Sequence, residues 1–493
     1  MEVIKTKQQF SWLGDVNEKG VIINTNHELC GQSITGKELH FPGASGSTVG
    51  PDALVNLARK GYAPSKIIIE RKNDNATIWG SIFGKVPLEI TGKKPKPIEK
   101  SQLEKLGIPA DVLEYVYKAS EYLDFEEFIP ITSPIQIAGV SYKTVKDAGL
   151  KIREDFSNKF KVKVPSVLNP AGMDLENWKK QRIPEDFAEK QMRIIRAYER
   201  MGAEPTCTCI PYYTGTLGIP FSETFWSESS AVSFANSVLG LKTNKESGLG
   251  SLLWAIAGYG PRYGLHLDKN RNPKVEIKVN AILKTTDDFG TLGYALGETI
   301  GDKVPYLRGI EPTDVSLDKL KSLGAAAAAS GDIPLYHIKD ITPEARAKTI
   351  SLGEMEHMEM GEKELLDARE KLNKGNVKDI DLVAFGCPHA SHREIKEIAE
   401  LLPGKKLKEG VDLWVCTARA EKAWSDKFGY TSVIERAGGR VYCDTCMVVA
   451  PIERIGYKTT ATNSGKAAYY LPNLCKQKVV FDNTEKIIEM VTR

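Results

Sequence analysis

Thiols and glycines stand at four places in this chain where they could support chemistry. The sequence reads CTC at 207–209, GCPH at 386–389 and CDTC at 443–446, and a glycine-rich stretch, FPGASGSTVG, spans 41–50. Cys387 follows an apolar stretch, DLVAF, and precedes an amphipathic one, SHREIKEIAELL, so we expect it where a strand ends and a helix begins. Because ligands bind at the carboxyl edge of open α/β sheets, thiols that are distant in sequence can meet there.

The cysteines admit three chemical interpretations. CxC and CxxC together could supply four zinc ligands, Cys207, Cys209, Cys443 and Cys446, in a closed structural site. CDTC alone could be a dithiol redox pair, although it lacks the position ahead of a helix that such pairs occupy. One cysteine from each of the three places could instead hold an iron–sulfur cluster, and three thiolates on four irons would leave one iron open as a Lewis acid. The spacing alone leaves these alternatives open.

The glycine-rich stretch could form a nest of backbone N–H groups around a serine. Gly43, Gly46 and Gly50 allow close approach to an anion, and Ser47 lies among them. A serine hydroxyl is a poor base unless its alkoxide is stabilised, and such a nest is one arrangement that stabilises it. Since no phosphate-loop signature is present, an ordinary turn is the alternative.

Polar residues are also concentrated in one otherwise apolar stretch, FWSESSAVSFANSVLG. Glu228 and Ser229 need polar partners when buried, so either a helix N-terminus or a polar ligand is expected to satisfy them. His389, close to Cys387, could orient a ligand or a substrate, whereas His266 has the strand-like neighbours of a core group with satisfied ring nitrogens.

The elements that must position these residues follow an alternating pattern. Helical patterns such as EDFAEKQMRIIRAYERMG and LDKLKSLGAAAAAS alternate with strand patterns such as DLVAFG and DLWVCT, which predicts parallel α/β layers. A charged stretch, GEMEHMEMGEKELLDAREKLNKG, predicts a long solvated helix between two α/β units. The basic, proline-rich TGKKPKPIEK at 91–100 has the composition of a linker that follows a small N-terminal domain.

Length and composition limit the class of protein. A chain of 493 residues is too long for one core, so we expect two to four domains. The net charge of +3, from 67 basic and 64 acidic side chains, argues against a nucleic-acid partner. Apolar runs too short for a membrane span, and the absence of a secretory signal at the N-terminus, predict a cytoplasmic protein without a membrane partner.

Several long motifs, taken in order, resemble one known family. PAGMDLENW, CTCIPYY, WSESSAVSFANSVLG, YGLHLDKNR, FGCPH, DTC and TNSGKAAYY resemble the large subunit of aconitase X, and NHELCGQSITGKELHFPGASGSTVG with GYAPSKIII resembles its small subunit. The resemblance implies an α/β protein with a small swivelling β/β/α domain over 1–92, a linker over 93–100 and an aconitase-like layered catalytic region over 101–493. We expect at least two α/β subdomains in the last region, with a junction near 350–378.

The resemblance also implies the site residues of an iron–sulfur hydro-lyase. Cys209, Cys387 and Cys446 would bind the cluster, most simply a [4Fe-4S] cluster, and Cys209 is preferred to Cys207 because it directly precedes the Ile-Pro-Tyr-Tyr run. Ser47 would be the general base. The substrate would contact eight further residues: Gly139, Val140, Ser141, Asn169, Pro170, Glu228, Ser229 and Lys466.

Two substrates are compatible with the resemblance. GSTVG and CTC favour (R)-5-phosphomevalonate, which would yield trans-anhydromevalonate 5-phosphate, whereas the fusion of the two subunits favours cis-3-hydroxy-L-proline. A zinc-stabilised binding protein without catalysis is the alternative of another class. The N-terminal domain is shortened after GKVPLEI, and the segment SQLEKLGIPADVLEYVYKASEYLDFEEF diverges from the family, which bears on substrate closure and on contacts within a homo-oligomer.

Overall fold

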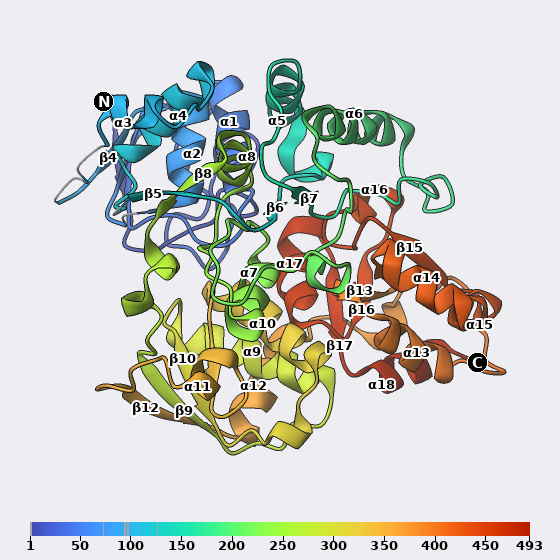
Figure 1. The fold of residues 1–493 in the computed structure, drawn as a ribbon. Coiled ribbons are helices and arrows are strands. Elements are labelled where there is room, and N and C mark those ends of the chain that lie inside the picture. The colour runs from blue at the N-terminus through green and yellow to red at the C-terminus, as the bar shows by residue number, and fades with distance from the viewer. Residues whose placement is uncertain (1, 72, 93–94, 96–97, 126) are drawn as a thin grey trace.

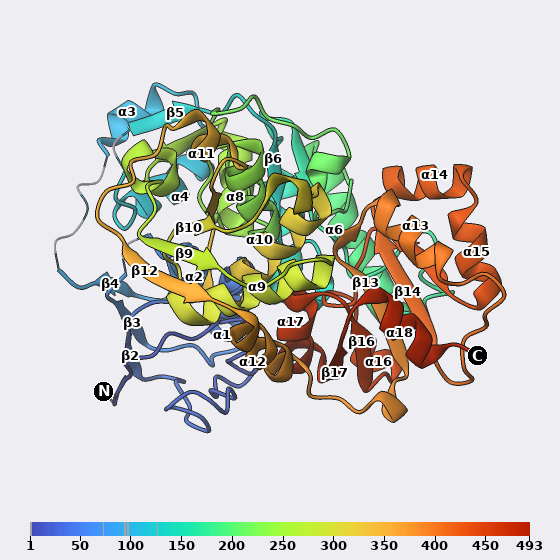
Figure 2. The same cartoon turned by 90° about the horizontal axis from the view of Figure 1, so that it is seen from below.

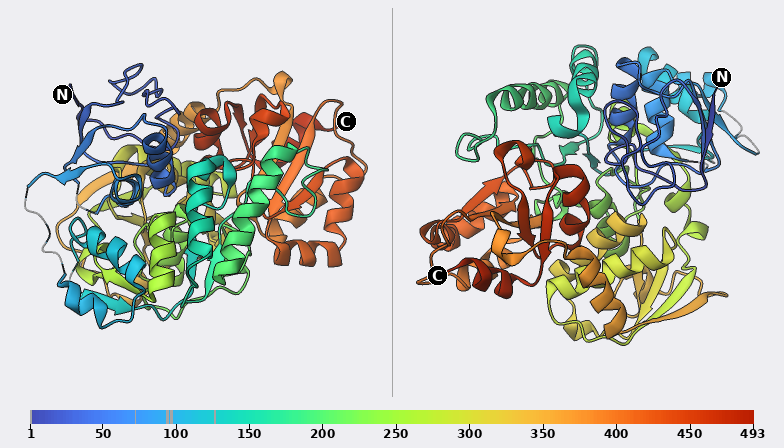
Figure 3. Two further views of the ribbon diagram at one scale, coloured as in Figure 1. Left: turned by 90° about the horizontal axis from the view of Figure 1, so that it is seen from above. Right: turned by 180° about the vertical axis from the view of Figure 1, so that it is seen from behind.

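Three parallel sheets, each with its own helices, make up most of the molecule (Figure 1). The structure is a computed structural model that describes residues 2–71, 73–92, 95, 98–125 and 127–493. Residues 93–94 and 96–97 of the predicted linker lie outside this part, and the predicted domain boundaries stay predictions. The three sheets form three lobes around a centre where β6, β7, α7 and α17 lie, and the two ends of the chain lie in different lobes (Figures 1 and 3).

The N-terminal lobe is a four-stranded parallel sheet covered by two helices. Its strands follow the order β1 (Val3–Lys5), β2 (Glu38–Phe41), β3 (Lys66–Ile69) and β4 (Leu88–Ile90). Helices α1 (Gly50–Arg59) and α2 (Asn75–Gly84) pack against each other. The rings of Phe10 and Phe41 stack in its core with their centroids 4.6 Å apart. The glycine-rich stretch is therefore the connection between β2 and the N-terminus of α1.

A helical region follows, with only short strands. Its elements are α3 (Lys100–Glu104), α4 (Ala110–Ser120), β5 (Glu127–Pro130), β6 (Ile135–Ile137), α5 (Tyr142–Ser157), β7 (Ser166–Leu168), α6 (Glu185–Met201), α7 (Ser229–Phe234), α8 (Gly248–Ala257) and β8 (Tyr259–Arg262). Strands β6 and β7 pair in parallel, and β5 and β8 pair antiparallel. Helix α6 buries an apolar face and ends at Gly202, whose φ of 89° is the left-handed conformation that favours glycine.

The second sheet has the order β11-β10-β9-β12 and is parallel throughout. Its elements are β9 (Val275–Val279), α9 (Thr286–Ile300), β10 (Pro305–Arg308), α10 (Leu317–Gly331), β11 (His337–Ile338), α11 (Pro343–Ala347), β12 (Glu356–Met360) and α12 (Glu362–Leu372). Helices α9 and α10 pack closely side by side, because glycines and the alanine run of α10 let their backbones approach (Figure 2).

The third sheet has the order β15-β14-β13-β16-β17 and is also parallel. Its elements are β13 (Leu382–Ala390), α13 (His392–Glu400), β14 (Asp412–Thr417), α14 (Arg419–Lys427), α15 (Tyr430–Ala437), β15 (Arg440–Cys443), α16 (Ile452–Ile455), β16 (Thr459–Thr462), α17 (Gly465–Cys475), β17 (Lys478–Phe481) and α18 (Thr484–Val491). The prediction of parallel α/β layers is confirmed.

One predicted element differs from the structure. The charged stretch that begins near 353 is not one long helix: Glu356–Met360 forms β12, and only Glu362–Leu372 is helical. Strand β12 pairs with β9 at the edge of the second sheet and leaves four of its five residues exposed. Pairing with an existing strand outweighs the helical propensity of Glu and Met here. Among the described residues, no helix is both long and apolar enough to cross a membrane.

Candidate active site

All twelve residues proposed for the site line one cavity between the N-terminal lobe and the rest of the chain. They come from five connections between elements and from one strand and two helix starts. Further lining residues are Leu13, Thr48, Val49, Thr144, Val448, Val449, Tyr470 and Leu474. Residues far apart in sequence therefore meet at one place, although their roles stay predictions.

Three thiols face this cavity from three different elements. Cys209 precedes a short 3-10 helix, Cys387 lies in β13, and Cys446 follows β15. A hydrogen bond from Cys387, helped by the N–H groups of Val449 and Val448, lowers the pKa of the Cys446 thiol to about 7. Burial raises the pKa of Cys209 to about 12, and its sulfur accepts a hydrogen bond from the backbone N–H of His389 at 3.2 Å. The three sulfurs are soft donors in a buried, partly polar setting, which suits iron.

The other cysteines take no part in this cavity. Cys207 and Cys443 are buried but do not line it, so the four ligands of the zinc interpretation are divided between two environments. Within the described part of the chain, no three His, Cys, Asp or Glu side chains are grouped tightly enough for a single metal ion. Cys209, Cys387 and Cys446 all line the active-site cavity, so three thiols are available there as a donor set for an iron–sulfur cluster.

Ser47 lies at the edge of the cavity, immediately before helix α1. The backbone N–H of Val49 donates to Ser47 Oγ at 3.3 Å, and the N–H of Gly50 donates to the Ser47 carbonyl at 3.0 Å. Gly46, with φ of +81°, makes the turn, and a Cβ there would lie 2.9 Å from Ser11 Oγ. The N-terminus of a ten-residue helix favours negative charge at this position. The local structure therefore places one N–H donor and a helix N-terminus beside Ser47, and both favour negative charge on its oxygen.

A buried ion pair forms the opposite wall. Lys466 Nζ bonds Glu228 and also donates to Ser230 Oγ at 3.2 Å. Glu228 is the N-cap of α7, and Asn169 Nδ2 donates to its other oxygen at 2.7 Å. Lys466 stands in the first turn of α17, where the helix dipole disfavours a cation. Its charge is therefore offset by Glu228 and not by the helix, and both side chains line the cavity.

The amide of Asn169 has one atom without a partner. Its Oδ1 is buried and accepts no hydrogen bond from any described residue. A buried acceptor in a cavity wall is normally satisfied by a ligand or a water. It is suited to a hydroxyl or another donor of a bound molecule.

The loop 139–141 is held by hydrogen bonds to helix α6 and to the segment that follows Cys446. Ser141 caps α5 and donates from Oγ to the carbonyl of Val449 at 2.8 Å, close to Cys446 in the chain. The Val140 carbonyl accepts from Gln191 Nε2 at 2.9 Å. Pro170 and Ser229 complete this part of the wall. The loop is therefore positioned by contacts to helix α6 and to the segment that carries a cysteine.

His389 has a different place from the expected one. It is fully buried, does not line the cavity, and uses both ring nitrogens, with Nδ1 at 3.0 Å from Thr208 Oγ1 and Nε2 at 2.9 Å from the Thr445 carbonyl. It packs behind the thiols and joins the residues next to Cys209 and Cys446. Sequence reasoning did not find the apolar wall residues such as Leu474 or Tyr470, because nothing in their types distinguishes them from core residues.

Comparison with known proteins places this site in a class. Four family models match, described as the aconitase X swivel domain (residues 2–106) and the first (104–269), second (273–370) and third (380–493) aconitase X domains. The phosphomevalonate dehydratase large subunit of Methanocaldococcus jannaschii is 50% identical over 370 residues, which are 74% of this chain and 91% of that protein. The small subunit from Methanopyrus kandleri is 40% identical over 88 residues, 18% of this chain and 64% of that protein.

Two further proteins are similar to this chain. One matches a larger share of its sequence, and the other matches its three-dimensional structure. The cis-3-hydroxy-L-proline dehydratase of Pseudomonas aeruginosa is 28% identical and covers 99% of this chain and 93% of its own length. A crystal structure of Thermococcus kodakaraensis aconitase X in its holo-form superposes with a TM-score of 0.71 at 42% identity, over 77% of this chain and 95% of that one.

These findings define the molecule as an enzyme of the hydro-lyase class, a dehydratase. The chain belongs to the aconitase X family, with the small and large subunits fused into one polypeptide. The predictions of the family, of the α/β fold with an N-terminal swivel domain and of a dehydratase are confirmed.

Proposed function

We propose that this enzyme is an iron–sulfur dehydratase that converts (R)-5-phosphomevalonate to trans-anhydromevalonate 5-phosphate. The observation that carries the proposal is the single cavity lined by three thiols, by Ser47 and by the Glu228–Lys466 pair. Two relatives named phosphomevalonate dehydratase large subunit are 50% and 44% identical to this chain, and a third is 32% identical, whereas two named cis-3-hydroxy-L-proline dehydratase are 28% and 27% identical.

Cys209, Cys387 and Cys446 would hold the cluster. When bound by three thiolates, a [4Fe-4S] cluster supplies one iron that can accept an oxygen ligand and act as a Lewis acid. Everything else in the reaction belongs to residues of the chain.

Ser47 would remove the proton next to the substrate carboxylate. Its alkoxide is stabilised by the Val49 N–H and by the N-terminus of α1. The electrons of the C–H bond become the new double bond as the hydroxyl leaves with its own bonding pair. Lys466 would attract a negative group of the substrate, Glu228 would hold the Lys466 ammonium, and Asn169 Oδ1 would accept a hydrogen bond from the substrate.

The second candidate substrate is cis-3-hydroxy-L-proline. One observation favours it: the hydroxyproline dehydratase of Pseudomonas aeruginosa matches 99% of this chain, so it shares the fused architecture. The same residues could act on either molecule, because both reactions need a base, a leaving hydroxyl and a cation for a carboxylate or a phosphate.

Anaerobic purification and reconstitution test the proposal. We expect a brown protein that contains iron and acid-labile sulfide and forms an alkene product from 5-phosphomevalonate, detected by NMR. Ser47→Ala should keep the iron and sulfide and lose turnover. A colourless protein with zinc and without iron after reconstitution would contradict the proposal, and turnover by Ser47→Ala at the wild-type rate would remove this serine from the mechanism.

A further inference from the structure

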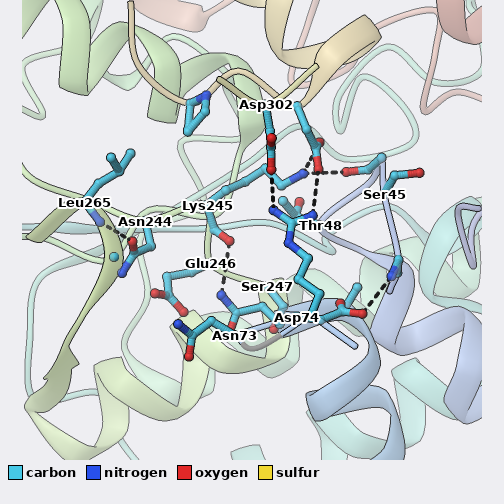
Figure 4. A pocket seen from close by; sticks show the side chains of 18 of the residues that line it. Ser45, Thr48, Asn73, Asp74, Asn244, Lys245, Glu246, Ser247, Leu265 and Asp302 are labelled. Carbon is cyan, nitrogen blue, oxygen red and sulfur yellow. Dashed lines mark hydrogen bonds and ion pairs between the residues drawn. The ribbon is translucent and has the colours of Figure 1, made fainter. Parts of the chain in front are cut away.

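A second cavity is lined by residues of the loop that carries Ser47, and Figure 4 shows it with Thr48, Lys245 and Asp302 in its walls. We call it the polar cavity; it measures about 280 Å³, and its walls include 44–48, 244–247, Arg71, Asp302 and Asp332. Ser47 and Thr48 line both this cavity and the active-site cavity. The loop that carries the proposed base is therefore a wall between two open spaces, and its position depends on what anchors it.

Two contacts from the large-subunit region hold the loop on either side of Ser47. Lys245 Nζ donates to the carbonyl of Gly46 at 2.9 Å, and the N–H of Gly248 donates to the carbonyl of Thr48 at 3.1 Å. The second anchor is a backbone bond at the start of α8, whereas the first depends on one side chain. Lys245 reaches the residue directly before the base.

Lys245 is itself fixed by a carboxylate in an unusual backbone position. Its ammonium forms an ion pair with Asp332, and both side chains are largely buried, at 20% and 12% exposed. Asp332 ends helix α10 with φ of +64°, a left-handed conformation that glycine adopts more readily than aspartate. Glycine at this position would therefore remove the carboxylate without straining the backbone.

The same carboxylate lies near a cation of the swivel domain. Arg71 lies 4.0 Å from Asp332 and donates to Asp302 at 3.2 Å, so charges from both regions meet around Asp332. Arg71 also packs against the glycine-rich stretch. A Cβ added at Gly43 would lie only 3.0 Å from the Cβ of Arg71. These contacts join the swivel domain to the large-subunit region in the same cavity that Ser47 lines.

We propose that Lys245, held by Asp332, is a positioning residue that fixes the Gly46–Ser47 peptide and thereby places Ser47 Oγ for proton removal. This inference rests on the proposed function in taking Ser47 as the base. A displacement of a catalytic group by about 1 Å can lower turnover by about 100-fold, so the loss of a single anchor is enough to be measured.

Three variants separate positioning from general stability. Lys245→Met removes the ammonium and keeps the aliphatic chain, and Lys245→Arg keeps a charge that can restore part of the anchor. Asp332→Gly removes the carboxylate and places at this left-handed position the residue that adopts the conformation most readily, so the backbone there keeps its geometry. Lys242→Met is the matched control, because Lys242 pairs with Asp268 and does not line the polar cavity.

The experiment uses the reconstituted full chain and two readouts. We expect hydrogen–deuterium exchange of a peptide covering 43–50 to be faster in Lys245→Met and Asp332→Gly than in the wild type and in Lys242→Met. In the same two variants, kcat should fall about 10- to 100-fold with KM within about threefold, and Lys245→Arg should recover part of it. Unchanged exchange and unchanged kcat in Lys245→Met would overturn the inference. Hydrogen–deuterium exchange needs no substrate. If the wild type showed no turnover, the proposed function would be overturned, but the exchange rates would still decide whether Lys245 anchors the loop.

Discussion

Asp52 of the swivel domain and Arg153 of helix α5 form an ion pair in which neither side chain has any exposed surface. Arg153 Nη2 donates to Asp52 Oδ2 at 3.0 Å, and Tyr198 OH accepts from Arg153 Nε at 3.1 Å. Asp52 is in the first turn of α1, just after Ser47, and α5 begins directly after Ser141. The pair therefore ties the helix that follows the proposed base to the helix that follows the loop 139–141, which is proposed to contact the substrate.

Breaking this pair should destabilise the fold strongly. Asp52→Asn leaves the Arg153 charge buried without its counter-ion, which typically costs about 3 to 5 kcal/mol. The free energy of unfolding from urea titration checks this. The control is Asp155→Asn, which removes the exposed Lys151–Asp155 pair of the same helix and should change stability by less than about 0.5 kcal/mol. Equal losses of unfolding free energy in the two variants would show that the buried pair contributes no more to stability than the exposed pair.

The three cysteines that line the cavity should be required for iron binding, whereas Cys207 should not be required. Cys209→Ser, Cys387→Ser and Cys446→Ser each remove a soft ligand and should lower iron and sulfide per chain to a small fraction of the wild-type content. Cys207→Ser should keep them, because Cys207 does not line the cavity. Cys30→Ser, at an exposed position, is the control. Loss of iron from Cys207→Ser with retention in Cys209→Ser would reverse the assignment.

Much of the fold was predictable from local pattern, and part of the site was not. Helix α6 follows from its apolar spacing and from Gly202, whereas the strand Glu356–Met360 exists because β9 offers a partner, which no local pattern encodes. The strand that carries Cys387 was predictable from its flanking residues, although β13 continues to Ala390, beyond the expected end before Cys387. The choice between Cys207 and Cys209 came from resemblance alone. The contact of Lys245 with Gly46 joins residues 199 positions apart and has no sequence signal.

Lys466 should matter for substrate affinity. Lys466→Met removes the cation proposed to attract the substrate and leaves Glu228 buried without its partner, and such truncations cost about 2 to 5 kcal/mol. We expect kcat/KM to fall about 100-fold or more, mostly through KM, in steady-state assays. Lys478→Met, at an exposed site on β17, should be unchanged. A KM for Lys466→Met equal to that of the wild type would place the substrate's negative groups elsewhere.

His266 should make the protein less stable in acid. Its ring stacks on Phe225 with centroids 4.7 Å apart, and neither ring nitrogen has a partner among the described residues, contrary to the expectation of a satisfied core group. Burial, with Arg271 and Arg262 nearby, lowers its pKa from 6.5 to about 3. The unfolded chain therefore binds a proton that the native state excludes, and stability falls as pH falls from about 6.5 towards 3.

His266→Phe should remove this part of the acid sensitivity. Unfolding free energies measured from pH 7 to pH 4 should decline less steeply in His266→Phe than in the wild type, because phenylalanine has no proton to bind. His357→Phe, which replaces an exposed ring, should follow the wild-type curve. Parallel curves for His266→Phe and the wild type would show that His266 does not titrate differently in the two states.

The central claim is a dehydratase whose preferred substrate is 5-phosphomevalonate. The most direct measurement is kcat/KM of the reconstituted wild-type chain for (R)-5-phosphomevalonate and for cis-3-hydroxy-L-proline under the same conditions, with both products identified by NMR. The account predicts trans-anhydromevalonate 5-phosphate and a ratio of at least about 100 in favour of the phosphorylated substrate, because a site built to bind a polar group of its substrate rejects a molecule that lacks this group. A ratio that favours cis-3-hydroxy-L-proline, with iron and sulfide present, would contradict it.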